Sequence, residues 1–271
     1  MLKKMALIGA GQMGSALVTG WVRSGLIPAT SIVVFDVDKN KTQSLEKELG
    51  TSTAVSAAEA IGPDTEALFL AVKPLDMADV LDEVSERVQD TPLVVSIAAG
   101  VTTEFILSHL HPTARVIRVM PNAGAMVGQS ASALCKAGSA DEADLQNALE
   151  MFKAVGRAVI VEEKMMNAVT ALSGSGPGYL FVIMEGLTDA GVRMGLSRVT
   201  ARELTVQTVL GAAVVAAQDG SPFSELKDRI TSPGGTTIAG LQVIERAGIR
   251  GTLMDAVEAA TRRGDELLAR G

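Results

Sequence analysis

Residues 5–14 read MALIGAGQMG, an apolar strand that runs directly into a glycine-rich turn. Gly9, Gly11 and Gly14 have the spacing of the G-x-G-x-x-G signature, and a helical pattern follows to about Ser24. In that signature the first glycine permits the tight turn, the second lets the backbone approach a pyrophosphate, and the third lets helix and strand pack closely. A purely structural glycine turn is the less favoured interpretation, because the flanking strand and helix are the context that the signature requires. The predicted dinucleotide contacts are Gly9, Ala10, Gly11, Gln12, Met13 and Gly14.

Strand and helix patterns alternate through the first half of the chain. A polar helix is predicted over 39–49, and the predicted strands cover residues 31–35, 67–72, 93–97, 115–120, 131–135 and 158–161. The segment 67–72 is continuously apolar, as expected of a strand buried on both faces of a sheet. This succession predicts an α/β fold, with a Rossmann-type doubly wound parallel sheet in a dinucleotide-binding domain of residues 1–161.

The pattern changes to helices alone after Val161. Helices are predicted over 164–172, 177–194, 199–218, 223–229, 236–246 and 250–269. Several of them look too apolar for a lone bundle in water, and small residues at 211–217 would permit close helix packing. An all-helical domain of residues 162–271 that forms a homodimer is therefore preferred to a self-contained bundle.

Composition narrows the class of protein. With 47% apolar residues the chain is expected to fold, and its net charge of −7, without a run of Lys or Arg, disfavours nucleic acid as a partner. The single cysteine, Cys135, excludes an internal disulfide, and with only His109 and His111 a metal site is not expected. No apolar run reaches about 18 residues, so no membrane partner is expected. The first residues lack a signal-peptide pattern, and a cytoplasmic location is expected by default.

Asp36 ends the second predicted strand and bears on the choice of cofactor. An acid at this position can accept hydrogen bonds from the ribose hydroxyls of NADH, and it would repel the 2′-phosphate of NADPH. Lys39 and Lys41 follow closely and would offset that repulsion, although lysines at a helix start are commonly just solvated. The preference between NADPH and NADH stays open, with a lean to NADH from Asp36.

Three loops follow the ends of predicted strands. Ligands of open parallel sheets bind beyond the carboxyl ends of the strands, so these loops are expected to line the nicotinamide half of the cleft. Ordinary turn chemistry is the alternative for each loop. The residues predicted to contact the cofactor are Ala71, Val72, Lys73, Pro74, Ala98, Ala99 and Asn122. A further glycine-rich segment, residues 173–179, is interpreted as a tight junction between two helices rather than a phosphate loop.

The segment 232–237 reads SPGGTT and leads into a predicted helix. The N–H groups at a helix start have no partner within the helix, so they can hold a carboxylate or a phosphate beside the hydroxyls of this turn. The predicted substrate contacts are Ser232, Gly234, Gly235, Thr236 and Thr237.

Five motifs in this order carry a resemblance to a known family. They are GAGQMG at 9–14, LAVKP at 70–74, AAGV at 98–101, AVTALSGSGP at 168–177 and SPGGTT at 232–237. Over essentially its whole length the chain resembles pyrroline-5-carboxylate reductase. The resemblance implies reduction of the cyclic imino acid L-1-pyrroline-5-carboxylate to L-proline by NADPH or NADH, as the last step of proline biosynthesis. It also implies an interlocked dimer that can assemble further, for example into a decamer, and an active site completed by the partner chain.

Thr237 matches the family threonine near the ring nitrogen, where it would orient the imine or assist its protonation. Helix capping is the alternative role for this residue. The chain departs from the family pattern at Gly178, at Pro121–Gly124, at Ala58 and at Asp36, and these departures bear on cofactor preference rather than on the reaction.

Three other interpretations remain to be weighed. A β-hydroxyacid dehydrogenase would need a lysine where Tyr179, Leu180 and Phe181 stand. A non-catalytic dinucleotide sensor would have no use for the turn at 232–237. A pyridoxal-phosphate-binding or other interaction protein finds no motif in the chain.

Overall fold

The computed structural model describes residues 4–88 and 92–268, and it divides into two compact units. Unit 1 comprises Met1–Ser175 with Ala260–Gly271, and unit 2 comprises Gly176–Ala259. The domain boundary after Val161 was drawn from the change from strands to helices, and it stays a prediction. Within the described residues, the last strand ends at Ile160.

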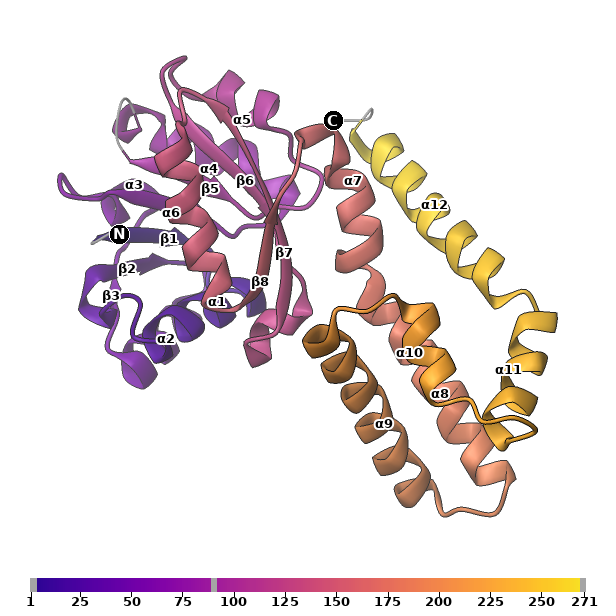
Figure 1. Cartoon of the computed structure of the whole chain (residues 1–271). Coiled ribbons are helices and arrows are strands. Elements are labelled where there is room, and N and C mark those ends of the chain that lie inside the picture. Colours follow the sequence, from indigo (N-terminus) through magenta and orange to yellow (C-terminus); the bar gives the residue numbers. More distant parts are fainter. Residues whose placement is uncertain (1–3, 89–91, 269–271) are drawn as a thin grey trace. The chain divides into compact units, whose positions relative to one another are not determined.

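Unit 1 is built on one eight-stranded sheet with the strand order β3-β2-β1-β4-β5-β6-β7-β8 (Figure 1). Its strands are β1 (Met5–Ile8), β2 (Ile32–Phe35), β3 (Ser52–Thr53), β4 (Ala67–Leu70), β5 (Leu93–Ser96), β6 (Arg115–Met120), β7 (Ser130–Gly138) and β8 (Gly156–Ile160). The order reverses at β1, which lies between β2 and β4. The predicted Rossmann-type doubly wound sheet is confirmed, and all but one of its strand pairs are parallel.

β7 is the exception to the parallel arrangement. It pairs antiparallel with β6, with Arg118 opposite Cys135, and β8 then pairs parallel with β7. The connection between Met120 and Ser130 holds only the short 3-10 turn Ala123–Val127. A parallel crossover needs about a dozen or more residues, so this connection can only return the chain alongside β6.

Alternate residues of the strands face two separate cores. Met5 and Leu7 belong to one core, and Ala6 and Ile8 belong to the other. The helices of unit 1 are α1 (Gln12–Arg23), α2 (Lys39–Leu49), α3 (Ala57–Ala60), α4 (Met77–Val84), α5 (Thr103–His109), α6 (Glu142–Lys153) and α7 (Met166–Val169). Side chains of α1, α2 and α6 fill the first core, and those of α3, α4 and α5 fill the second. Helices therefore cover both faces, which explains why the strands are continuously apolar.

Trp21 lies at the centre of the first core. Its ring lies 4.7 Å from that of Phe69, and its indole Nε1 donates to the carbonyl of Met151 at 2.9 Å. This bond satisfies the buried N–H and ties α1 to α6.

Unit 2 consists of helices. They are α8 (Gly176–Arg193), α9 (Arg198–Asp219), α10 (Phe223–Arg229), α11 (Thr236–Arg246) and the part of α12 (Ile249–Leu268) that precedes residue 260. α8 and α9 pack closely where Gly191 faces Ala201, because a Cβ on Gly191 would lie 3.0 Å from that of Ala201. The predicted helices agree with these bounds within about two residues.

The helices of unit 2 leave much of their apolar surface uncovered. Phe181 is 66% exposed, Val182 69% and Val215 54%. α9 is the one helix among the described residues with the length and composition of a membrane span, and only 6% of its apolar window is buried. Uncovered apolar area of this extent marks an interaction surface.

Candidate active site

The three glycines of the first turn have three different roles. Gly9 has a φ of +101°, and a Cβ there would lie 2.5 Å from the carbonyl oxygen of Ala71. A Cβ on Gly14 would overlap the carbonyl oxygen of Gly9. Among the residues that the structure describes, nothing lies within 4 Å of the position that a Cβ on Gly11 would take. Gly9 and Gly14 therefore serve the fold, and Gly11 leaves an open surface for a ligand.

The N-terminus of α1 offers N–H groups at this open surface. Gly11 is the N-cap of α1, and the Ser15 amide donates to the carbonyl of Gly11 at 2.9 Å. The amides of Gln12, Met13 and Gly14 precede that first bond, so they have no acceptor within the helix. A pyrophosphate at this position would meet these amides and the positive end of the helix dipole.

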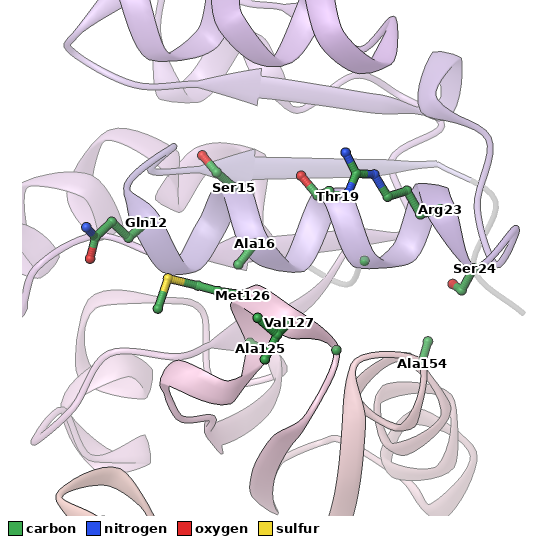
Figure 2. Close-up of a pocket in the computed structure, with 12 residues that line it drawn as sticks. Gln12, Ser15, Ala16, Thr19, Arg23, Ser24, Ala125, Met126, Val127 and Ala154 are labelled. Carbon is green, nitrogen blue, oxygen red and sulfur yellow. The ribbon is translucent and has the colours of Figure 1, made fainter. Parts of the chain in front are cut away.

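A groove flanks α1 on its outer side (Figure 2). It begins at Gln12, where Met126 of the 3-10 turn lies beneath the helix, and it extends along α1 to Arg23 and Ser24. This direction leads away from the carboxyl ends of the strands. Of the residues predicted to contact the cofactor, Gln12 alone is among those that line this groove.

The carboxylate of Asp36 is already engaged within the protein. Its Oδ2 accepts from the Ala10 amide at 2.7 Å, and its Oδ1 accepts from the Asp38 amide at 2.8 Å and from Lys41 Nζ at 3.3 Å. The side chain is 9% exposed. In the structure Asp36 therefore braces the glycine turn against the end of β2. The expected contact of Asp36 with the ribose hydroxyls stays a prediction.

The remaining predicted cofactor residues gather at one edge of the sheet. Ala71, Ala98 and Asn122 lie just beyond the ends of β4, β5 and β6, which are neighbours in the sheet. The Ala71 amide donates to Ile8 at 2.8 Å, and this bond places the β4 loop directly beside the glycine turn. Lys73 and Pro74 are exposed, Ala99 is exposed, and Ala98 is buried. The side-chain amide of Asn122 is bonded within the protein rather than left free.

An ion pair that sequence reasoning missed lies beneath the β5 loop. Arg118, 5% exposed, donates to Glu163 Oε1 at 3.0 Å, and Glu163 also accepts from the amide and the hydroxyl of Thr103. Burial alone would raise the pKa of Glu163, but the bonds from Thr103 and Arg118 outweigh it and hold that pKa below its ordinary value. Burial, with the charge of Glu163, also raises the pKa of the neighbouring Cys135 to about 11, so this thiol stays protonated. The only sequence signal was an arginine inside an apolar strand.

Replacing Glu163 by glutamine is expected to lower the free energy of unfolding at pH 7 by about 1–2 kcal/mol, because a charged acceptor becomes a neutral one. The folded-state pKa of Glu163 lies below the ordinary 4.5, so its contribution is present above that pH and is lost as pH falls through the folded value. Urea unfolding at pH 7 and near pH 4 should show the difference from the wild type shrinking. Glu162→Gln is the matched control, since Glu162 is 73% exposed and should have little effect. An equal cost at both pH values would contradict this assignment.

The turn at 232–237 has the form that its sequence predicts. The Gly235 amide donates to the carbonyl of Ser232 at 3.1 Å, and Gly234 has a φ of +67°. Proline at the second and glycine at the third position are typical of a type II turn. The Ser232 hydroxyl lies against Gly235, where a Cβ would overlap it. α11 then begins at Thr236, so the amides of Thr236, Thr237 and Ile238 come before any intrahelical acceptor.

Charged contacts within unit 2 involve α10, the helix that precedes this turn. Arg229, at the end of α10, donates to Asp219 at 2.6 Å, which secures α10 against the end of α9, and to Glu225 of its own helix at 2.6 Å. A groove beside the turn is lined by Lys227, Gly234, Gly235, Ile238, Ala239, Leu241, Gln242 and Glu245. Ile238 and Gln242 were missed from the sequence, although the spacing 235, 238, 242 marks one face of a helix.

Comparison with known proteins finds the same two-part organisation. A family model described as pyrroline-5-carboxylate reductase dimerisation matches residues 163–267, and one described as NADP oxidoreductase, coenzyme F420-dependent, matches residues 4–100. A pyrroline-5-carboxylate reductase from Methanosarcina acetivorans is 43% identical over 98% of both chains. One from Escherichia coli is 34% identical over 98% of this chain and 99% of its own.

The chain belongs to the pyrroline-5-carboxylate reductase family.

Solved structures support the assignment. A pyrroline-5-carboxylate reductase from Coxiella burnetii matches with a TM-score of 0.94 and 34% identity, covering 98% of this chain and 99% of its own. A pyrroline carboxylate reductase from Plasmodium falciparum with NADP bound matches with a TM-score of 0.86 and 30% identity, covering 98% of each chain. As a pyrroline-5-carboxylate reductase the protein is an NAD(P)H-dependent oxidoreductase of proline biosynthesis, as the sequence predicted. Its helical region is a dimerisation domain, which accounts for the exposed apolar surface of unit 2. The individual site residues stay predictions.

Proposed function

We propose that the enzyme reduces L-1-pyrroline-5-carboxylate to L-proline with the imine held at the 232–237 turn and the nicotinamide held by the loops of unit 1. The turn carries this proposal, because it presents free amides and hydroxyls at the start of α11 without a charged side chain of its own. A compact anion such as the substrate carboxylate fits such a site. Sites from two chains of the dimer would complete one another.

The reaction requires the protein mainly to position the imine and the nicotinamide. A bound nicotinamide would supply a hydride from its C4 to the imine carbon. The C=N double bond would become a single bond, and the ring nitrogen would keep the proton that it carries as an iminium. A protonated imine is already a good hydride acceptor, so the rate gain comes mainly from holding donor and acceptor carbon together. Thr237 would orient the ring nitrogen through its hydroxyl.

The proposal is tested by adding pyrroline-5-carboxylate to the purified enzyme with NADPH or NADH. Cofactor oxidation should depend on the imine, and proline should appear in equal amount by chromatography. Absence of turnover with both cofactors would refute the proposed reaction.

Asp36→Asn is expected to raise KM for NADH and NADPH alike, by about 5- to 10-fold, because the amide of Ala10 loses a charged acceptor. If Asp36 instead discriminates between the cofactors, the ratio of kcat/KM for NADPH over NADH should rise at least tenfold. Steady-state kinetics with both cofactors distinguishes these outcomes. Asp38→Asn is the matched control, since Asp38 accepts from Asn40 at the start of α2 and makes no bond to the glycine turn.

The assembly is proposed to go beyond a dimer, with dimers associating further, for example into a decamer. We place the enzyme in the cytoplasm, without a membrane or nucleic-acid partner, since the apolar face of α9 suits burial against a second copy. Light scattering on the purified protein without detergent measures the assembly. A protein that is soluble only with detergent would contradict this part of the proposal.

A further inference from the structure

The carbonyl of Ser173 lacks the donor that an α-helix would supply. In an α-helix it would accept from the amide four residues later, but that residue is Pro177, which has no N–H. The helix is also underwound into a π-turn over Thr170–Gly174, in which the Ser175 amide donates to the carbonyl of Thr170 at 2.8 Å. At the predicted helix junction, the π-turn and α8 thus follow one another closely, and the Ser173 carbonyl has no i+4 N–H to accept from.

Asn122 supplies the missing donor from a distant part of the sequence. Its Nδ2 donates to the carbonyl of Ser173 at 3.0 Å. Its Oδ1 accepts from the amides of Gly124 and Ala131, both at 3.1 Å. Two N–H donors on one side and a carbonyl on the other leave a single orientation of the amide that satisfies all three groups. The side chain thus joins the end of β6, the start of β7 and the π-turn.

The π-turn also packs tightly against the end of β6. A Cβ on Gly174 would lie 2.7 Å from Cε of Met120. The Ser173 hydroxyl turns back to the carbonyl of Val169 at 3.0 Å, so it offers no alternative donor to its own carbonyl. Unit 2 begins at Gly176, immediately after this segment. Asn122 therefore bonds to unit 1 at Ser173, three residues before the chain enters unit 2.

We propose that Asn122 is a positioning residue whose side chain holds the π-turn Thr170–Gly174 in place within unit 1, rather than a ligand of the nicotinamide. It acts by replacing the hydrogen bond that Pro177 cannot make. The consequence for turnover rests on the proposed function, because the substrate turn belongs to unit 2 and the cofactor turn to unit 1. The stability of the π-turn itself can be measured without substrate.

Asn122→Asp is the informative change, because it keeps the acceptor for Gly124 and Ala131 and removes the donor to Ser173. We expect kcat/KM for pyrroline-5-carboxylate to fall about tenfold, with most of the loss in kcat, while Kd for NADPH changes less than about threefold. Hydrogen exchange of the Ser175 amide should accelerate at least about tenfold, since its bond to Thr170 closes the π-turn.

Pro177→Ala provides the rescue, since it returns a backbone N–H to the position facing Ser173. In the Pro177→Ala background, Asn122→Asp should lower kcat/KM by a factor at least about threefold smaller than in the wild type. The loss of exchange protection at Ser175 should shrink by a similar factor. Pro28→Ala is the matched control, because Pro28 precedes β2 at the other side of the sheet and should leave the cost unchanged.

Two results would overturn the proposal. One is a loss of NADPH affinity that matches the loss of kcat/KM, which would make Asn122 a cofactor ligand. The other is a failure of Pro177→Ala to reduce the effect of Asn122→Asp, or an equal reduction by the control Pro28→Ala. If the wild type did not turn over the imine, the proposed function would fail, and the exchange measurements would still decide the role of Asn122.

Discussion

Gly11→Ala is expected to weaken NADPH binding about 100-fold while leaving the fold intact. Among the described residues no atom lies within 4 Å of the added methyl group, which would occupy the space proposed for the pyrophosphate. Gly11 has φ −66° and ψ −176°, a backbone conformation open to any residue. Losing two charge-assisted hydrogen bonds of about 1.5 kcal/mol each corresponds to roughly this factor in Kd. Fluorescence titration with NADPH measures the affinity, and the melting temperature should move by less than about 2 °C.

Gly14→Ala, in contrast to Gly11→Ala, is expected to destabilise the fold itself. Its Cβ would overlap the carbonyl of Gly9 and come within 3.2 Å of Cβ of Ala71, all in well-packed surroundings. A cost of about 3 kcal/mol or more in the free energy of unfolding follows from such overpacking. Urea unfolding of the two variants side by side separates the ligand-facing glycine from the fold-bearing one. Comparable destabilisation by both changes would contradict the division of roles.

Thr237→Ala should lower kcat/KM for pyrroline-5-carboxylate by about 50- to 100-fold, the scale of one well-placed polar group that acts on the reacting centre. Thr237 lies in the first turn of α11 and is half-buried. Among the described residues no side chain caps this helix, so the capping role for Thr237 finds no bond to support it. The loss is therefore expected without a change in the free energy of unfolding.

Thr237→Ser is the matched control, because it keeps the hydroxyl and removes only the methyl group. It should retain kcat/KM within about fivefold. A variant Thr237→Ala with unchanged kcat/KM would remove the residue from the mechanism. A variant that lost stability and activity together would support the capping role instead.

Most elements of the fold could be predicted from local patterns in the sequence. The glycine signature, the apolar strands and the change to helices after residue 161 each depend on neighbours in the sequence, and each led to the right element. The direction of β7 was missed, since it depends on the length of the connection from Met120 to Ser130 rather than on any strand pattern. β3 was also missed, because two residues, Ser52 and Thr53, are too few to show a period.

The site was harder to predict wherever a side chain has several partners. The position of Asp36 was clear from the sequence, but its bond to the Ala10 amide depends on the spacing between two loops. The same holds for Arg118, Thr103 and Glu163, which come from three separate elements. Residue type limits what a group can bind, and only the fold determines what it does bind.

The exposed apolar length of α9 has a consequence for how this enzyme behaves in dilute solution. A helix with 6% of its apolar window buried contributes little to holding its own chain together, so part of the folding free energy is supplied by association. The melting temperature should then rise with protein concentration, and chains from two preparations should exchange slowly. In a cell, the abundance of the enzyme would set not only its flux but also the lifetime of each copy, because unassembled chains present α9 to proteases.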